Sequence, residues 1–582
     1  MIGMPRRLTA GDIRSGLPLP VPFAPAIHAV FFIAPALLYF LTAARDPGWG
    51  DAAMIVSQAS NPDLGSWVDT HSLFDLLGFL WLRLFPAGNV FFHLVLLSAL
   101  FGVLAVYGMF QVVLELTGEL ISAGFAALVL MVSHSLWWHS TMVEVYTLNS
   151  AIMTAMLVFL FRYDRTGAWP YLGISAFFCG LGITNHVLMG LFLFAYVALA
   201  IFLAVRPRPK AGKAIGLAIL FLIAGAGFYI FLFFRDVSRA VPAHAAPAAW
   251  MRDFWAAFRS TLSDATVGHF GSHMFSRGLP ARLMAFWRIN YAFLLFCNFP
   301  TPALAMGITG IWAFWKMRSS RLSFFFFVTA MAAQAVWSSN YFVWDMYAFI
   351  QPVCVLLCIP VGLCARRLLQ SPRALRTAFL VLIVPMIAFP PFLYSRLSSF
   401  YRSVGFLHRF LDTYPTKAFA AHTYEPVEYV ANPIKRAYDK VELYARALFA
   451  ALPPNSHFLD SDARADYPLR YYYQERLHER TDIIYNSLWS PAITEHDARS
   501  EALQLKHALD RGEPVFAASI EMPERLVLDQ LFVLNDPGAD LEFVREMPAQ
   551  EYVERFPGID LQRIVFSEPD EIWIYRLAPR PH

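Results

Sequence analysis

The run His139-Ser-Thr-Met-Val-Glu144-Val-Tyr146-Thr-Leu-Asn149 lies between two long apolar segments and places an acid, a tyrosine and an amide where they meet. A second acid, Asp51, follows the first apolar span in Pro47-Gly-Trp-Gly-Asp51. A carboxylate costs roughly 2.5–3.5 kcal/mol at the centre of a bilayer, and this cost largely disappears at a helix end that faces water. Two acids at helix ends therefore predict chemistry at a membrane surface, on a substrate whose tail stays in lipid.

The composition excludes a single soluble domain. The chain has 582 residues, of which 57% are hydrophobic and 15% are charged, and the apolar residues form long runs. The first run is followed by no clear cleavage site, so we interpret it as a retained helix. Runs long enough to cross a bilayer predict about eleven helices, at residues 25–44, 91–114, 120–137, 145–161, 170–185, 187–205, 214–234, 287–315, 322–339, 346–365 and 375–395.

Basic residues predict the orientation of these spans. If the spans alternate, every arginine and lysine cluster in a short connection falls on one side, and positive charge in short loops marks the cytoplasm. Residues 1–24 are therefore expected in the cytoplasm and the C-terminal region on the opposite side. The clusters are Arg6, Arg7 and Arg14; Arg162 and Arg165; Arg206, Arg208, Lys210 and Lys213; Lys316, Arg318 and Arg321; and Arg366, Arg367, Arg373 and Arg376.

The domain organisation follows from the same pattern. Residues 25–395 form the predicted transmembrane domain, with long outer loops at 45–90 and 235–286, and the apolar periodicity of residues 73–85 predicts an interfacial helix. Residues 396–582 are richer in charge and tyrosine and predict an α/β domain outside the membrane. Its expected helices are 424–451, 464–476 and 498–511, and its expected strands are 458–459, 483–485, 515–520, 564–566 and 572–575.

Several short motifs resemble, in their order along the chain, a bacterial membrane family long catalogued as a domain of unknown function. Glu144-Val-Tyr-Thr-Leu-Asn149 is the most specific of them. The others are Gly48-Trp-Gly-Asp51, Pro86-Ala-Gly-Asn89, Leu97-Ser-Ala-Leu100, Gly182-Ile-Thr-Asn185-His186, Asp345-Met-Tyr347 with Pro352, Leu452-Pro-Pro-Asn455, Asp460-Ser-Asp462 and Tyr467-Pro-Leu469.

This family is related to the animal O-mannosyltransferase that acts on IPT domains of plexins and related receptors. Such proteins look like GT-C glycosyltransferases, which use a polyprenyl-phosphate sugar outside the cytoplasm. The resemblance implies a GT-C-like membrane enzyme of a bacterial inner membrane, with its C-terminal domain in the periplasm. The family usually has a His-Pro-Pro-Gly segment in the first loop, where this chain has Trp67-Val-Asp-Thr-His71.

Asp51 and Glu144 are the candidate catalytic residues. A sugar on a lipid phosphate has a good leaving group, and a carboxylate that takes the proton of the attacking hydroxyl typically contributes about 10²–10⁴-fold in rate. Direct displacement with Asp51 as the base would invert the anomeric centre. Glu144 would orient the acceptor, share a proton with Asp51 or help to hold a metal. The plainer alternatives are that Asp51 caps a short helix at 52–59 and that Glu144 is stabilised by the dipole of the helix it begins.

Seven further residues are candidates for substrate binding. Asn185 and His186 interrupt an apolar run, which is costly unless they face a polar cavity or form a turn between helices. Arg288 lies near the outer end of a span, where it would bind the lipid phosphate or extend to headgroups. The other candidates are His71, Tyr146, Asp345 and Tyr347. No ligand spacing predicts a metal site, and a requirement for a divalent metal stays open.

We therefore predict a glycosyltransferase that moves a sugar from a polyprenyl-phosphate donor to a hydroxyl on a protein, a lipid or an envelope glycan. The expected partners are this donor, the acceptor and membrane lipids, and no nucleic-acid signature is present. The alternatives are a lipid or glycan transporter and a non-enzymatic scaffold for envelope assembly. A transporter often shows related halves and polar residues near span centres, whereas here the polar residues cluster at outer ends.

Overall fold

The computed structural model separates the chain into two compact units. The helical unit comprises residues 1–43 and 58–396, and the C-terminal unit comprises residues 44–57 and 397–582. The structure describes residues 24–61, 71–206, 208–241, 247–263, 281–341, 346–403, 426–460, 463–472, 480–487, 495–519, 524–535, 540–555, 559–567 and 570–577.

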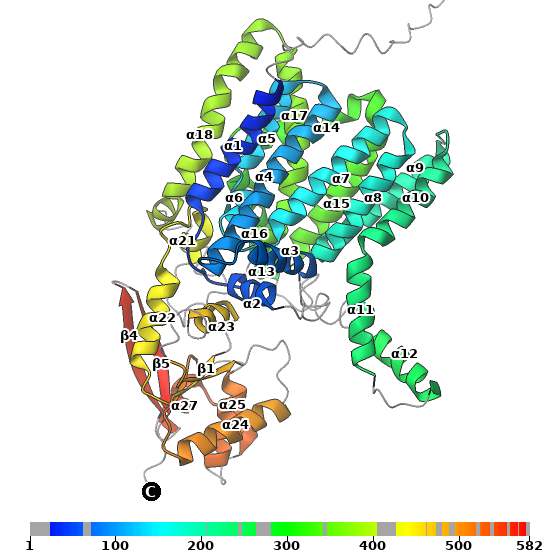
Figure 1. Ribbon diagram of the computed structural model, residues 1–582. Helices are drawn as coiled ribbons and strands as arrows, with labels where there is room; N and C mark the ends of the chain where they lie inside the picture. The colour runs from blue at the N-terminus through cyan, green and yellow to red at the C-terminus, as the bar shows by residue number, and fades with distance from the viewer. Residues whose placement is uncertain are drawn as a thin grey trace, which may run out of the picture. The chain divides into compact units, whose positions relative to one another are not determined.

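Helices make up the first unit, and they pack mostly along their lengths (Figure 1). Helix α2 begins in the C-terminal unit and ends in the helical unit, and α18 crosses the boundary in the opposite direction. The elements are α1 (Ala24–Thr42), α2 (Ala52–Ser60), α3 (Ser72–Leu84), α4 (Val90–Thr117), α5 (Leu120–Met131), α6 (His134–Ser140), α7 (Tyr146–Thr166), α8 (Trp169–Asn185), the 3₁₀ helix η2 (Val187–Leu191), α9 (Phe192–Val205), α10 (Ala211–Gly225), α11 (Gly227–Arg239), α12 (Pro247–Ser263), α13 (Ala281–Asn298), α14 (Ala303–Lys316), η4 (Arg318–Ser320), α15 (Arg321–Asn340), α16 (Met346–Phe349), α17 (Gln351–Leu369) and α18 (Arg373–Ser403).

Several of these helices can cross a membrane. Five described helices are long and apolar enough, or up to eight when each sharply bent pair is counted as one span. Phe194, Val197 and Ile201 on α9 also expose large apolar side chains, as a lipid-facing helix does. The chain is therefore a multi-pass membrane protein, and the larger figure of eleven spans stays a prediction.

Three predicted spans are bent rather than continuous. The pairs α5 with α6, α10 with α11 and α13 with α14 meet at 63°, 53° and 94°. The prediction of one helix over 287–315 is wrong, because Pro300 and Pro302 lie where α13 ends and α14 begins. A proline has no backbone N–H to donate and disfavours the helical conformation of the residue before it, so the helix stops there.

Small residues let two of the helices approach closely. A Cβ on Gly180 of α8 would overlap the backbone of α10, and a Cβ on Gly225 of α10 would overlap the backbone of α8. Close contact through glycine is typical of helix pairs in membranes, where packing rather than the hydrophobic effect holds helices together. Helices α8 and α10 accordingly lie side by side in Figure 1.

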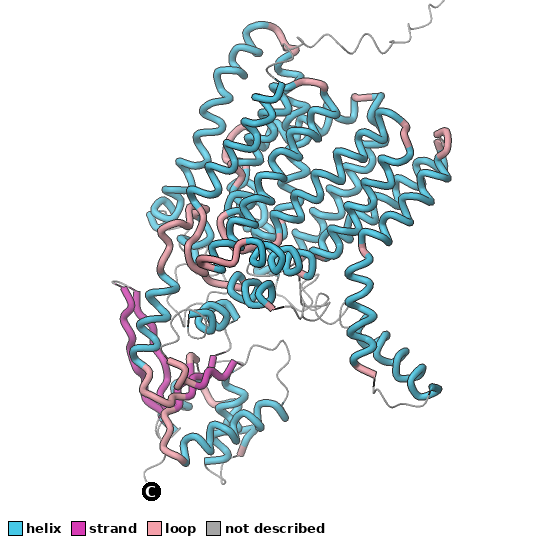
Figure 2. Tube along the Cα trace, in the orientation of Figure 1, coloured by secondary structure: helices cyan, strands magenta, loops and turns pink. Residues whose placement is uncertain are grey.

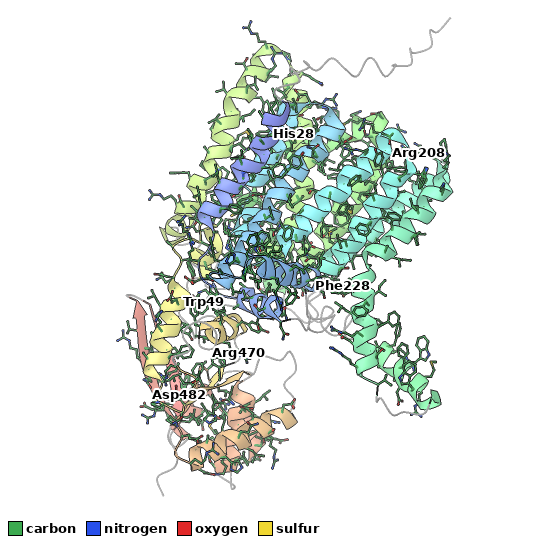
Figure 3. The ribbon with its side chains drawn as sticks, viewed as in Figure 1. His28, Trp49, Arg208, Phe228, Arg470 and Asp482 are labelled. Atoms are coloured by element: carbon green, nitrogen blue, oxygen red, sulfur yellow. The ribbon has the colours of Figure 1, made fainter. Side chains whose placement is uncertain are left out.

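Ion pairs gather the basic connections at one end of the helical unit. Arg162 and Arg165 at the end of α7 bind Glu115 near the end of α4. Arg208 binds Asp164, whose other carboxylate oxygen accepts hydrogen bonds from the backbone N–H and hydroxyl of Ser323. In Figure 3, Arg208 lies toward one end of the helices and Phe228 of α11 toward the other.

The C-terminal unit holds all the strands that the structure describes (Figure 2). Its sheet has the order β2-β1-β3-β5-β4; β1 pairs in parallel with β2 and β3, and β5 pairs in antiparallel fashion with β3 and β4. The elements are α21 (Pro426–Ala431), α22 (Lys440–Ala451), β1 (His457–Asp460), α23 (Ala463–Arg470), β2 (Ile484–Ser487), α24 (Glu495–Asp510), β3 (Val515–Ala517), α25 (Glu524–Asn535), α26 (Leu541–Glu546), α27 (Ala549–Arg555), β4 (Ile559–Ser567) and β5 (Asp570–Leu577).

The predicted helix over 424–451 is broken within the described part of the chain. Helix α21 ends at Ala431, residues 432–439 form an irregular segment, and α22 begins at Lys440. Pro433 explains the break, because it cannot donate the hydrogen bond that would continue α21. The irregular segment carries Lys435, which binds Tyr429, and Tyr438, which binds Trp49, as described below.

Candidate functional site

A row of aromatic and imidazole rings brings together four of the predicted site residues and His139, which was not predicted. His71 stacks on His186, with ring centroids 5.1 Å apart and planes 9° apart. His186 lies 5.0 Å from Tyr146, and His139 then lies 5.0 Å from Tyr146 and 5.6 Å from Tyr347. These rings come from the segment before α3, the break between α8 and η2, the start of α7, the end of α6, and α16.

His71 is held in this row by burial and by a hydrogen bond. Its Nδ1 lies 3.3 Å from the carbonyl oxygen of Asn185. Burial lowers the pKa of His71 to about 4, so the imidazole is neutral at neutral pH. Because a carbonyl oxygen only accepts, Nδ1 carries the single proton of the neutral ring, and Nε2 is left as an acceptor that can bind a hydroxyl group.

Three side chains from three helices hold the backbone of Glu144, Val145 and Tyr146. The Ser98 hydroxyl of α4 donates to the Glu144 carbonyl and accepts from the Glu144 N–H, both at 3.1 Å. The remaining two contacts come from Asn185 Nδ2 at the end of α8, which donates to the Val145 carbonyl at 3.0 Å, and from Gln351 Nε2 at the start of α17, which donates to the Tyr146 carbonyl at 3.1 Å. The segment that carries the candidate acid is therefore fixed by α4, α8 and α17 together.

The side-chain amides of Asn185 and Gln351 also bind polar side chains of α7. Asn185 Nδ2 lies 2.8 Å from Asn149 Oδ1, and Gln351 Nε2 lies 2.7 Å from the Ser150 hydroxyl. Asn149 Nδ2 and Gln351 Oε1 are buried and have no hydrogen-bond partner within the described residues. They line a small pocket with Tyr146, Ser150, Met153, Leu188, Met189 and Pro352. The pocket has room for about one water molecule, and orphaned polar atoms beside such a cavity are typically satisfied by a bound water or a small polar group.

The remaining predicted site residues have different outcomes. Glu144 is buried, with 6% of its surface exposed, and precedes Tyr146 by two positions in the chain. Asp51 precedes α2 in the C-terminal unit, and its carbonyl accepts from the Ile55 N–H at 2.9 Å, as in the first turn of a helix. Arg288 lies on α13 with an exposed side chain. Asp345 falls outside the described residues.

The sequence interpretation did not select His139, Gln351 or Asp75 as site residues. His139 and Gln351 are polar residues that the structure buries almost completely. Their positions at the edges of apolar runs were the signal available in the sequence. Asp75 lies on α3 with no exposed surface, and neither carboxylate oxygen has a partner in the described part of the chain. Burial raises the pKa of Asp75 to about 8.

No group of three or more His, Cys, Asp and Glu side chains in the described ranges is arranged to hold a metal ion. The five cysteines are all free thiols, and four of them are buried.

The site falls in a region with recognisable relatives. Residues 71–209 match the family model of the protein O-mannosyl-transferase TMEM260 N-terminal domain. The protein O-mannosyl-transferase TMEM260 of Mus musculus is 28% identical over 182 residues, which cover 30% of this chain. The chain spans only 26% of the mouse protein's length. The matched region contains His71, Glu144, Tyr146, Asn185 and His186, whereas Asp51 lies before it.

Solved structures show the same fold over nearly the whole chain. Two crystal structures of ArnT from Cupriavidus metallidurans, one in the apo state and one bound to undecaprenyl phosphate, each cover 96% of this chain and 100% of their own. Their TM-scores are 0.53 and 0.54 at 13% sequence identity. The chain therefore has the GT-C fold, and at this identity the likeness describes the fold alone.

The Ser98 contacts lead to a first prediction. Replacing Ser98 with alanine removes both hydrogen bonds to Glu144, and we expect turnover to fall about tenfold or more, because small displacements of a catalytic segment are costly. Ser122→Ala is the matched control, since Ser122 is an equally buried serine near the start of α5. Both variants should lose comparable stability in thermal melts, and only Ser98→Ala should lose turnover. Equal turnover in the two variants would contradict the positioning role of Ser98.

Asp75 leads to a second prediction, on stability. Its folded pKa of about 8 lies above the ordinary value, so the folded protein keeps a proton that the unfolded chain releases above about pH 4. Stability should therefore fall as pH rises from about 4 to about 8, by at most about 6 kcal/mol, since one pKa unit is worth about 1.4 kcal/mol. Asp75→Asn should flatten this dependence in melts of detergent-solubilised protein between pH 5 and 8.5. An unchanged slope would show that Asp75 is not a protonated buried acid.

Proposed function

We propose that this chain is a glycosyltransferase that moves a sugar from a polyprenyl-phosphate donor to an acceptor hydroxyl at the outer face of the membrane. The observation that carries the proposal is the position of two features: the row of five rings, and residues 144–146, whose backbone is hydrogen-bonded from α4, α8 and α17. Both lie largely within the residues that match the O-mannosyl-transferase model, on a fold shared with ArnT, one structure of which holds undecaprenyl phosphate.

The proposed reaction is a single displacement at the anomeric carbon. An acceptor oxygen forms the new bond to this carbon, the bond from the carbon to the phosphate oxygen breaks, and polyprenyl phosphate leaves. Asp51 takes the proton of the acceptor hydroxyl, and the anomeric centre is inverted. A carboxylate is suited to this step, because it gains the proton as the nucleophile attacks, and burial raises the pKa of Asp51, which strengthens it as a base.

Glu144 would orient the acceptor hydroxyl toward the sugar. The backbone of Glu144 is held from α4, and its side chain is almost fully buried, so its position is set before substrate binds. Preorganised groups of this kind contribute to catalysis because no reorganisation is needed in the transition state.

The rings of Tyr146, His186 and Tyr347 would line the sugar pocket. Sugars present C–H faces that pack on aromatic rings and hydroxyls that bind amides, and the row combines both kinds of surface with Asn149 and Gln351. His71 would accept a hydrogen bond from a sugar hydroxyl through Nε2, and Arg288 would supply the positive charge for the phosphate. Asp345 would complete the lining beside Tyr347.

The membrane arrangement belongs to the same proposal. The grouping of Glu115, Asp164 and their arginine partners at one end of the helices supports a cytoplasmic end that is distinct from the end carrying the rings. Eleven spans would place the N-terminus in the cytoplasm and residues 396–582 in the periplasm of a bacterial inner membrane. The acceptor, a protein, a lipid or an envelope glycan, would be recognised there.

A panel of donors tests this function. Purified full-length protein in lipid nanodiscs is incubated with single polyprenyl-phosphate sugars, beginning with the mannosyl donor, and free polyprenyl phosphate is measured by mass spectrometry. We expect one donor to be consumed faster than the others in the presence of a hydroxyl acceptor. Failure to consume any of the sugars, with correctly folded protein, would leave a transporter or a scaffold as the better interpretation.

A further inference from the structure

The start of the first predicted outer loop belongs to the C-terminal unit, although about 340 residues separate it from the rest of that unit in the chain. Residues 44–57, which include Asp51, form one compact unit with residues 397–582. Trp49, labelled in Figure 3, lies beside the segment that holds α21 and α22. The candidate base is therefore only two residues from a tryptophan that the C-terminal unit binds.

Two hydrogen bonds and a ring contact hold Trp49. The Tyr429 hydroxyl of α21 donates to the Trp49 carbonyl at 2.8 Å, and the Trp49 indole N–H donates to the Tyr438 hydroxyl at 3.0 Å. The Trp49 ring also lies 5.2 Å from the ring of Tyr444 on α22. Both ends of the residue, its backbone and its indole, are thus fixed by different elements of the same unit.

The residues that hold Trp49 are themselves rigidly placed. Tyr429 and Tyr444 have no exposed surface, and the Tyr429 and Tyr438 rings are 5.1 Å apart. The ammonium group of Lys435 lies 4.3 Å from the centre of the Tyr429 ring and donates to the Tyr429 carbonyl. A buried cation over an aromatic ring stabilises the arrangement, and it comes from the segment where Pro433 interrupts the helix.

Two glycines show how closely the loop follows this surface. A Cβ on Gly48 would overlap the Tyr429 ring, so no other residue fits there without moving the tyrosine. Gly50 has φ of +102°, a conformation that residues with a side chain rarely adopt. The chain turns at Gly50, directly between Trp49 and Asp51. The contacts that hold Trp49 therefore fix the position of the backbone from which Asp51 extends.

We infer that the C-terminal unit positions Asp51 through Trp49, Tyr429 and Tyr438. It therefore contributes to the rate of sugar transfer. This inference rests on the proposed role of Asp51 as the base. Trp49, Tyr429 and Tyr438 are positioning residues, because they contact the segment that carries the acid and no reacting atom. Loosening this anchor lowers turnover, because a base displaced by about 1 Å loses on the order of 10²-fold in rate. Donor affinity is set elsewhere, so KM for the donor is unchanged.

The test uses the full-length chain and changes that remove the hydrogen-bonding groups; the Tyr→Phe changes also keep the ring. Tyr429→Phe removes the hydrogen bond to the Trp49 carbonyl, while Trp49→Phe and Tyr438→Phe each remove one partner of the indole hydrogen bond. Tyr485→Phe is the matched control, because the Tyr485 hydroxyl donates to Asp460 at 2.7 Å in the sheet of the same unit. Turnover, KM for the donor and hydrogen exchange of the peptide covering residues 44–57 are measured for each.

We expect Tyr429→Phe to lower kcat about 10- to 100-fold with KM unchanged, and to speed amide exchange at residues 44–57. Trp49→Phe and Tyr438→Phe should not be additive in kcat, since both remove the same hydrogen bond. Tyr485→Phe should change neither kcat nor exchange in this peptide.

The failures of the two ideas can be told apart. If the wild-type chain transfers sugar and Asp51→Asn does not, while Tyr429→Phe and Trp49→Phe keep wild-type kcat, the positioning role is wrong and the base survives. If faster exchange occurs with no change in kcat, the anchor is only structural and the inference also fails. If Asp51→Asn keeps full activity, the proposed base is wrong, whatever the anchor does.

Discussion

Replacing Asp51 with asparagine is expected to lower sugar transfer by about 10²–10⁴-fold while the protein keeps its fold. Asparagine has nearly the same shape as aspartate but cannot take a proton from the acceptor hydroxyl. The Ile55 N–H binds the backbone carbonyl of residue 51, so the start of α2 does not need the carboxylate for this contact. The variant should therefore melt close to the wild type and bind the donor normally.

Asp46→Asn is the control for this experiment. Asp46 lies five residues earlier in the same loop and the same unit, and the chemical change is identical. The measurement is initial rate of polyprenyl-phosphate release at saturating donor, together with a melting curve. Full activity in Asp51→Asn would exclude it as the base, and an equal loss in Asp46→Asn would attribute the effect to the loop rather than to one carboxylate.

Glu144→Gln is expected to produce the second-largest loss, about 10²-fold in kcat/KM for the acceptor. Glutamine keeps the length of the side chain and the backbone contacts with Ser98, but it removes the negative charge that would orient the acceptor hydroxyl. Glu144 is buried, with 6% of its surface exposed, and the proposed mechanism assigns no other acid to orient the acceptor.

Glu119→Gln is the matched control for Glu144→Gln. Glu119 caps α5 by accepting from the Ser122 N–H at 3.3 Å, in the connection that leads out of α4, whereas Glu144 precedes α7. We expect this control to lose at most about 1 kcal/mol of stability and to keep wild-type transfer activity. A Glu144→Gln variant with wild-type kcat/KM for every acceptor tested would assign Glu144 a structural role, such as the dipole interaction at the start of α7.

Most of the helices are readable from the sequence, because a run of about 20 apolar residues has few alternatives to a membrane helix. The failures occur where prolines interrupt such a run without lowering its hydropathy. Residues 287–315 look continuous by composition, yet Pro300 and Pro302 separate α13 from α14. The helix predicted over 424–451 fails at Pro433 for the same reason.

The clustering of His71, Tyr146, His186 and Tyr347 follows from the expected alternation of spans, because all four were placed at outer ends. His139 and Gln351 were harder to select, since a polar residue near the end of a span is compatible with many roles until its hydrogen bonds are known. The anchoring of Trp49 by Tyr429 could not be predicted at all, because local periodicity carries no information about contacts between residues 380 positions apart.

One structure determination tests the central claim most directly: cryo-electron microscopy of the full-length Asp51→Asn variant in nanodiscs with the polyprenyl-phosphate sugar that the donor panel identifies. We expect the side chains of residues 51 and 144 to line a single water-filled cavity at the outer leaflet, with the sugar between them and the prenyl chain leaving sideways into lipid. A map that places residues 51 and 144 at opposite membrane faces, or in separate cavities, would contradict the proposed enzyme.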